Sequence, residues 1–201
     1  MSGKRVIIVT DGDMAAKRAV EVAAQNVGGR CISLSGGHQP GEPFLQPEEI
    51  VGMVLSAPHD PVIVMVDDTG KSGEGQGEKV LKGLIEHSEI DVIGVVAVAS
   101  NSPYSKGVHV DTSVTKEGIV VAGPVNKKGY PQGQGKLVGD TVGILEKLDI
   151  PIIIGLGDPG KMDYADDAGK GAPITTKALQ TIIKQAGKQR VTAGVGADTQ
   201  E

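Results

Sequence analysis

Residues 6–21 read VIIVTDGDMAAKRAVE. An apolar, β-branched run ends in two acids that flank a glycine, and a pattern of helical spacing follows at once. A buried strand followed directly by a helix is typical of a parallel sheet covered by helices. In such open sheets, ligands bind outside the carboxyl ends of the strands, which is where Asp11 and Asp13 would lie.

The same alternation of strand and helix recurs along the chain. Apolar runs predict further strands at 31–34, 61–66, 92–99 and 150–156, and helical spacing predicts helices at 14–27, 47–57, 78–87, 140–148 and 175–186. We therefore predict a three-layer α/β/α, Rossmann-like domain with a mainly parallel sheet of about five strands. The expected strand order is 2-1-3-4-5 or 3-2-1-4-5.

Two segments fall outside this alternation. Residues 103–137 hold short extended pieces joined by Gly, Pro and Lys turns, which predicts a small β-hairpin excursion, or arm, inserted into one domain of residues 1–186. Residues 187–201 are polar and aperiodic, which predicts a disordered C-terminal tail.

Composition excludes several functional classes. The 201-residue chain has a net charge of −5, so it has no bulk electrostatic attraction for nucleic acid. Its apolar runs are all shorter than the roughly 18 residues of a membrane-spanning helix. The first residues lead directly into a strand, so we expect no signal peptide. The single cysteine, Cys31, excludes an internal disulfide and suits a reducing cytosol.

Polar side chains collect at one predicted edge of the sheet, because parallel strands end at a common edge. The members of this group are Asp11, Asp13, Ser35, Asp67, Asp68, Ser100, Asn101 and Asp158. Lys161 follows shortly after Asp158 in the sequence. Clustered carboxylates repel one another and need a cation, a proton or an arginine nearby. Mg²⁺ is the simplest such cation, and Ca²⁺ tolerates a less regular set of oxygen ligands.

A metal-dependent phosphoryl site is one interpretation of this edge. Asp11 would be a nucleophile or ligand, Asp13 a general acid or base, and Lys161 a charge clamp. The metal ligands would be Asp11, Asp13, Asp67, Asp68 and Asp158, and the ligand contacts Ser35, Gly36, Gly37, Ser100 and Asn101. The alternative is purely local: Asp13 caps the helix that follows, and Asp11-Gly12 forms a turn. The acidic tract 163–167 lacks EF-hand spacing and is expected to be a solvated loop.

Longer segments of the chain carry a resemblance to a known family. They are 9–13, 16–21, 27–37, 60–62, 67–68, 73–75, 95–101, 139–142, 157–163 and 171–175. In these segments the chain resembles the stage V sporulation protein AE family, the AE-type proteins of the SpoVA group, and together they extend from about residue 4 to residue 186.

The resemblance implies a role in bacterial spores, because the SpoVA group is associated with movement of dipicolinic acid, with calcium, during sporulation and germination. It implies a soluble accessory or binding subunit rather than an enzyme, cytoplasmic or peripheral at the inner spore membrane beside other SpoVA proteins. Residues 103–137 would offer a partner surface. The alternative is an Mg²⁺-dependent phosphohydrolase or a nucleotide- or phosphate-binding enzyme. A third hypothesis joins the two, with Ca²⁺ or calcium dipicolinate bound at the acidic edge.

Overall fold

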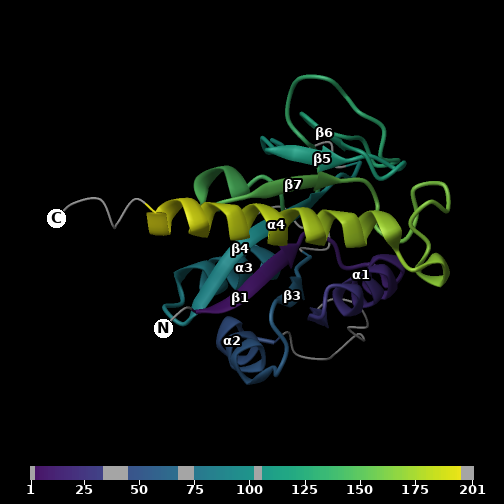
Figure 1. Cartoon of the computed structure of the whole chain (residues 1–201). Helices are drawn as coiled ribbons and strands as arrows, with labels where there is room; N and C mark the ends of the chain where they lie inside the picture. Colours follow the sequence, from purple (N-terminus) through teal and green to yellow (C-terminus); the bar gives the residue numbers. More distant parts are fainter. Residues whose placement is uncertain (1–2, 34–44, 68–74, 102–105, 196–201) are drawn as a thin grey trace.

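The computed structural model in Figure 1 describes residues 3–33, 45–67, 75–101 and 106–195. Its strands are β1 (Lys4–Val9), β2 (Arg30–Ser33), β3 (Val62–Met65), β4 (Ile90–Val98), β5 (Thr112–Val114), β6 (Val120–Val121) and β7 (Ile153–Leu156). Its α-helices are α1 (Met14–Asn26), α2 (Pro47–Ser56), α3 (Gln76–Glu86) and α4 (Pro173–Val195). The predicted α/β class is confirmed. Within these ranges, no helix is long and apolar enough to cross a bilayer.

The strands form one sheet in the order β2-β3-β1-β4-β7-β5-β6. Every neighbouring pair is parallel except β5 and β6. The five predicted strands therefore lie in the order 2-3-1-4-5, and both predicted orders are wrong. Hydrophobic periodicity reports which residues are buried but not which strand lies beside which, and here β3 returns to lie between β2 and β1.

Two helical layers cover this sheet. On β1, Ile7 and Val9 face the core beneath α1 and α4, whereas Val6 and Ile8 face the core beneath α2 and α3. Within each layer the two helices also contact one another. Because α1, which follows β1, and α3, which leads into its neighbour β4, lie on opposite faces, the crevice of the fold opens at the carboxyl end of β1.

The predicted hairpin within residues 103–137 is present, but it is part of the sheet. β5 and β6 pair antiparallel, and β5 also pairs in parallel with β7. In Figure 1 the two strands form the edge of the sheet farthest from α2. The segment therefore lies against the strand that leads into the candidate site.

Two predicted helices differ from those observed. The helix expected at 140–148 is only a 3₁₀ turn at Leu145–Lys147, because Thr141 has a left-handed backbone (φ 57°) that interrupts helical geometry. The last helix does not end near residue 186, as predicted, but continues to Val195, and Arg190 in its final turns pairs with Asp91. Residues 196–201 of the predicted tail lie outside the described residues.

Candidate functional site

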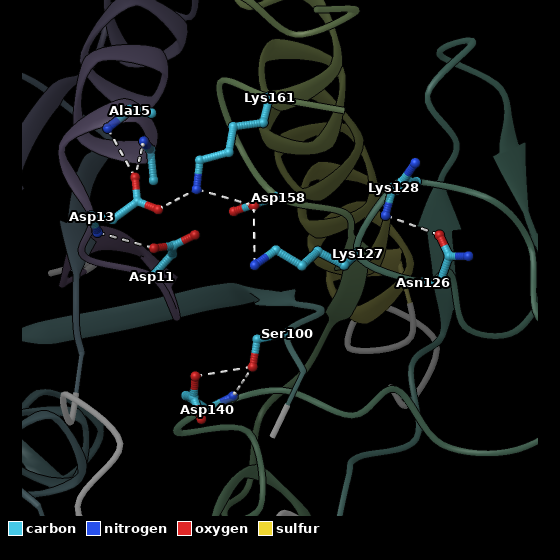
Figure 2. A network of polar contacts seen from close by, with 11 residues as sticks. Asp11, Asp13, Ala15, Ser100, Asn126, Lys127, Lys128, Asp140, Asp158 and Lys161 are labelled. Atoms are coloured by element: carbon cyan, nitrogen blue, oxygen red, sulfur yellow. Dashed lines mark hydrogen bonds and ion pairs between the residues drawn. The ribbon is translucent and has the colours of Figure 1, made fainter. Parts of the chain in front are cut away.

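The turn between β1 and α1 carries the first two acids of the site. Asp13 is the N-cap of α1, and its Oδ1 accepts hydrogen bonds from the N–H groups of Ala15 (2.8 Å) and Ala16 (2.9 Å). The Oδ1 atom of Asp11 accepts the N–H of Asp13 at 3.1 Å. The predicted N-cap role of Asp13 is therefore confirmed. Helix capping occupies only one oxygen of Asp13, and the other faces Lys161 (Figure 2).

A third acid joins them from the loop that follows β7. Asp11, Asp13 and Asp158 each place one carboxylate oxygen within 4.8 Å of the others. Asp158 is only 6 % exposed, so its charge is largely removed from water. Residues from both ends of the folded chain thus meet at the carboxyl edge, as the parallel sheet requires.

Two lysines neutralise much of this charge. The Nζ atom of Lys161 lies 2.5 Å from Oδ2 of Asp13 and 3.0 Å from Oδ2 of Asp158, and Nζ of Lys127 lies 3.5 Å from Asp158 (Figure 2). We call Asp11, Asp13, Asp158, Lys127 and Lys161 the acid–lysine cluster. The sequence indicated Lys161 but not Lys127, which belongs to the segment predicted to be an arm.

The backbone fixes Lys127 in this position. The N–H of Asp158 donates to the carbonyl oxygen of Lys127 at 2.8 Å, which joins the turn at 126–129 to the end of β7. Asn126 closes that turn, because its Oδ1 accepts from the N–H groups of Lys128 (2.9 Å) and Tyr130 (3.1 Å). The only sequence signal was an Asn-Lys-Lys-Gly turn, which says nothing about its neighbour in space.

The environment shifts three ionisation equilibria in the cluster. Burial raises the pKa of Asp11 from 3.8 to about 7, and the neighbouring carboxylates of Asp13 and Asp158 add to the shift. Burial also acts to raise the pKa of Asp13, but the Lys161 ammonium and the capping N–H groups outweigh it and lower that pKa. Burial acts to lower the pKa of Lys161, and its two carboxylate partners reverse this and raise it.

Two adjoining cavities open around the cluster. The smaller, about 230 Å³, is lined by Asp11, Asp13, Asp158 and Lys127, together with Asp67 and Ser100. The larger, about 380 Å³, lies between the 126–129 turn and the β7–α4 loop. Asp158 and Lys127 line both cavities.

The remaining predicted site residues divide into three groups. Asp67 lines the smaller cavity. Among the described residues, the acids whose carboxylate oxygens lie within 4.8 Å of one another are Asp11, Asp13 and Asp158, and Asp67 does not belong to this group. Ser100 bonds Asp140, with Oγ donating to Oδ2 and accepting the Asp140 N–H, both at 3.0 Å, and Asn101 lines the larger cavity. The other predicted residues, Ser35, Gly36, Gly37 and Asp68, lie outside the described residues.

The loop from β7 to α4 is held by a buried acid. Asp166 is fully buried, and its carboxylate accepts the N–H groups of Gly160, Ile174 and Thr175 and the Thr175 hydroxyl, at 2.5–2.9 Å. The expectation of a solvated acidic loop is therefore wrong for this residue. Asp166 connects the turn that carries Lys161 to the first turn of α4.

The donor set of the cluster fits a hard divalent cation. Ca²⁺ binds carboxylate oxygens at about 2.3–2.6 Å, so oxygens up to about 5 Å apart can share one ion. Asp11, Asp13 and Asp158 meet that condition. However, the Lys161 ammonium already contacts two of the three carboxylates. A cation held by all three would therefore have to displace Lys161.

The raised pKa of Asp11 predicts a pH-dependent stability. A carboxyl whose pKa is higher in the folded than in the unfolded chain loses its stabilising contribution as the pH rises between the two values, here from about 4 to about 7. Asp11→Asn keeps the acceptor for the Asp13 N–H and removes the charge. We expect this variant to melt about 2–5 °C above the parent at pH 8 and no higher than the parent at pH 4. A gain of equal size at both pH values in thermal unfolding would contradict the assignment.

Comparisons with known proteins identify the family. The model of the stage V sporulation protein AE1 family matches residues 5–186. Among curated proteins there is no significant match. A crystal structure of a domain of unknown function from Bordetella bronchiseptica, a domain-swapped dimer with bound citrate, is similar at 15 % identity and a TM-score of 0.36. The similarity covers 89 % of this chain and 42 % of that one, so the chain spans less than half of that protein.

The family match extends over most of the chain and includes the β1–α1 turn, the turn at 126–129 and the β7–α4 loop. The chain therefore belongs to the stage V sporulation protein AE1 family, and its role lies in sporulation, in the context of the SpoVA proteins.

Proposed function

We propose that this protein is an accessory subunit of the SpoVA system that binds calcium dipicolinate at the acid–lysine cluster. The observation that carries the proposal is the pairing, beside one cavity, of three carboxylates within 4.8 Å of one another with the ammonium groups of Lys127 and Lys161. Carboxylates suit the calcium ion, and ammonium groups suit the carboxylates of dipicolinate. Sporulation and the SpoVA context come from the family, and the ligand is our proposal.

The chemistry of the ligand matches this combination. Ca²⁺ takes six to eight ligands in flexible geometry. Dipicolinate occupies only part of that shell, with two carboxylates and a ring nitrogen, so oxygens of Asp11, Asp13 and Asp158 would complete it. The free oxygens of dipicolinate carry negative charge that the lysines would neutralise.

Calorimetry tests the proposal directly. We expect calcium and dipicolinate together to release binding heat, and we expect Asp158→Asn to weaken that binding about tenfold or more, because it removes one buried charged ligand. Asp149→Asn is the matched control, since Asp149 is an exposed acid outside both cavities. If calcium with dipicolinate gives no heat with the parent protein, or if both variants bind equally, the proposal is wrong.

The partner-binding part of the proposal concerns the exposed edge of the sheet. Ile119 is 59 % exposed and Val120 is 39 % exposed at β6, and both are apolar residues within the segment proposed as a partner surface. We propose that other SpoVA proteins contact this edge. Ile119→Lys would reduce co-purification with them without touching the cluster, whereas unchanged co-purification would remove the assignment.

A second candidate function is Mg²⁺-dependent phosphoryl transfer. The observation in its favour is the Asp11 pKa of about 7, which suits a general acid or base at neutral pH, beside a second carboxylate. The test is hydrolysis of phosphate esters with Mg²⁺ by the parent protein and by Asp11→Asn. The absence of turnover by the parent would remove this candidate and leave the binding proposal intact.

A further inference from the structure

We propose that the larger cavity is a separate anion site, which takes a carboxylate or phosphate group, and that Lys161 couples it to the cation site in the smaller cavity. The cavity measures about 380 Å³ and lies between the 126–129 turn and the β7–α4 loop. This proposal rests on the proposed function only in taking the cation bound at the acid–lysine cluster to be calcium. The anion site itself does not depend on calcium or dipicolinate.

The charges around the larger cavity favour an anion. It is lined by the side chains of Lys127, Lys128 and Lys161, against two acids, Asp158 and Asp163. Asp163 is paired with Lys116 at 3.5 Å, outside the lining, and with Lys128 at 3.7 Å, within it. The lining therefore holds three lysines against two acids, an excess of one positive charge, although the chain as a whole carries −5.

Amide donors add to this positive charge. Asn126 uses its Oδ1 to close the turn, and its Nδ2 has no hydrogen-bond partner among the residues that the structure describes. Asn101 lines the same cavity. Lysine ammonium groups together with neutral N–H donors are the usual partners of carboxylate and phosphate oxygens.

Tight packing brings the two sides of the larger cavity, the 126–129 turn and the β7–α4 loop, close together. A Cβ on Gly157 would lie 2.7 Å from both the Gly129 nitrogen and the Met162 sulfur, and one on Gly129 would lie 2.9 Å from that same sulfur. Met162 is buried, with a left-handed backbone (φ 49°). The glycines allow the 126–129 turn to approach the β7–α4 loop this closely, which brings Lys128 and Lys161 to the same cavity.

Lys161 belongs to both sites. Its side chain lines the larger cavity, while its ammonium contacts Asp13 and Asp158. A cation bound to these carboxylates would displace the ammonium, which would then be available to an anion in the larger cavity. Each ligand would therefore strengthen binding of the other, and by the same factor.

The first experiment measures anion binding without any divalent cation. Inorganic phosphate and malonate are titrated separately into the full chain, with chemical shifts of backbone amides as the readout, and the two arms show whether the site prefers phosphate or carboxylate. We expect shifts at 126–129 and 158–163, and about tenfold weaker binding in Lys128→Gln. Lys184→Gln is the control, because Lys184 is an exposed lysine of α4 outside both cavities.

The second experiment measures the coupling. With calcium present, we expect the same anion to bind more tightly to the parent protein, and we expect Lys161→Met to lose this gain. Lys128→Gln should leave calcium affinity unchanged. If neither anion binds at millimolar concentration, or if Lys128→Gln and Lys184→Gln behave alike, the anion site is disproved, even where calcium dipicolinate binds. If an anion binds but calcium does not change its affinity, the coupling is disproved.

Discussion

Asp166→Ala is expected to lower the melting temperature by about 10–15 °C, the largest effect of any single substitution considered. The carboxylate is fully buried and accepts hydrogen bonds from three backbone N–H groups and one hydroxyl. Alanine would leave these donors without a partner away from water, at a cost of about 3–5 kcal/mol. The measurement is thermal unfolding at pH 7.

The adjacent acid provides the control for this prediction. The Asp167 side chain accepts a single hydrogen bond, from the N–H of Gly169 at 2.8 Å, and the residue is only partly buried. Asp167→Ala should therefore cost about 1 kcal/mol. A similar loss for the two variants would show that Asp166 does not hold the β7–α4 loop in the way the hydrogen bonds indicate.

The second large effect is expected for Lys161→Met at pH 8. The substitution removes the ammonium that contacts both Asp13 and Asp158 and leaves three carboxylates with Lys127 alone. Because Lys161 is partly exposed and Lys127 remains, we expect a loss of about 1–3 kcal/mol rather than the full cost of an unpaired buried charge. Calcium should stabilise this variant more than it stabilises the parent, since the Lys161 ammonium no longer competes for the acids.

The pH dependence of this loss follows from the pKa shifts. Asp13 has a lowered pKa in the folded chain, so the stability that it gains from Lys161 is present above about pH 4 and disappears as the pH falls through the folded value. Protonation of Asp11 near pH 7 relieves part of the repulsion first. In thermal unfolding from pH 8 down to pH 3, the difference between variant and parent should therefore shrink as the pH falls through 7 and disappear only below about pH 4. Lys161→Arg keeps the charge and should recover most of the stability, and a constant difference at all pH values would exclude this explanation.

The local pattern of apolar residues was enough to predict the strands after which the acids of the cluster lie. The apolar run at the start of the chain and the Asp-Gly-Asp that ends it predicted both the strand and the helix cap, because burial and capping depend on neighbours within a few residues. A shared carboxyl edge then follows for any parallel sheet. For this reason Asp11, Asp13 and Asp158 could be expected to meet before their distances were known.

The features that the sequence did not reveal depend on contacts between distant segments. Lys127 enters the cluster because β5 pairs with β7, and the apolar run at 150–156 that predicted β7 does not say which strand pairs with it. Asp166 is one of several acids in a polar tract, and its burial results from its contact with the first turn of α4. Periodicity cannot identify such partners, because it describes a residue's own element and not the element it meets.

The composition of the cluster also determines when it can form during synthesis. Its first two acids lie in the β1–α1 turn, which is synthesised before β7, whereas Asp158 and Lys161 follow β7 and depend on a loop that Asp166 ties to α4. A nascent chain that lacks α4 would have the cluster residues but not the Asp166 contacts that hold the loop carrying Asp158 and Lys161. Ligand binding at this edge would therefore report that translation and folding of the domain are complete.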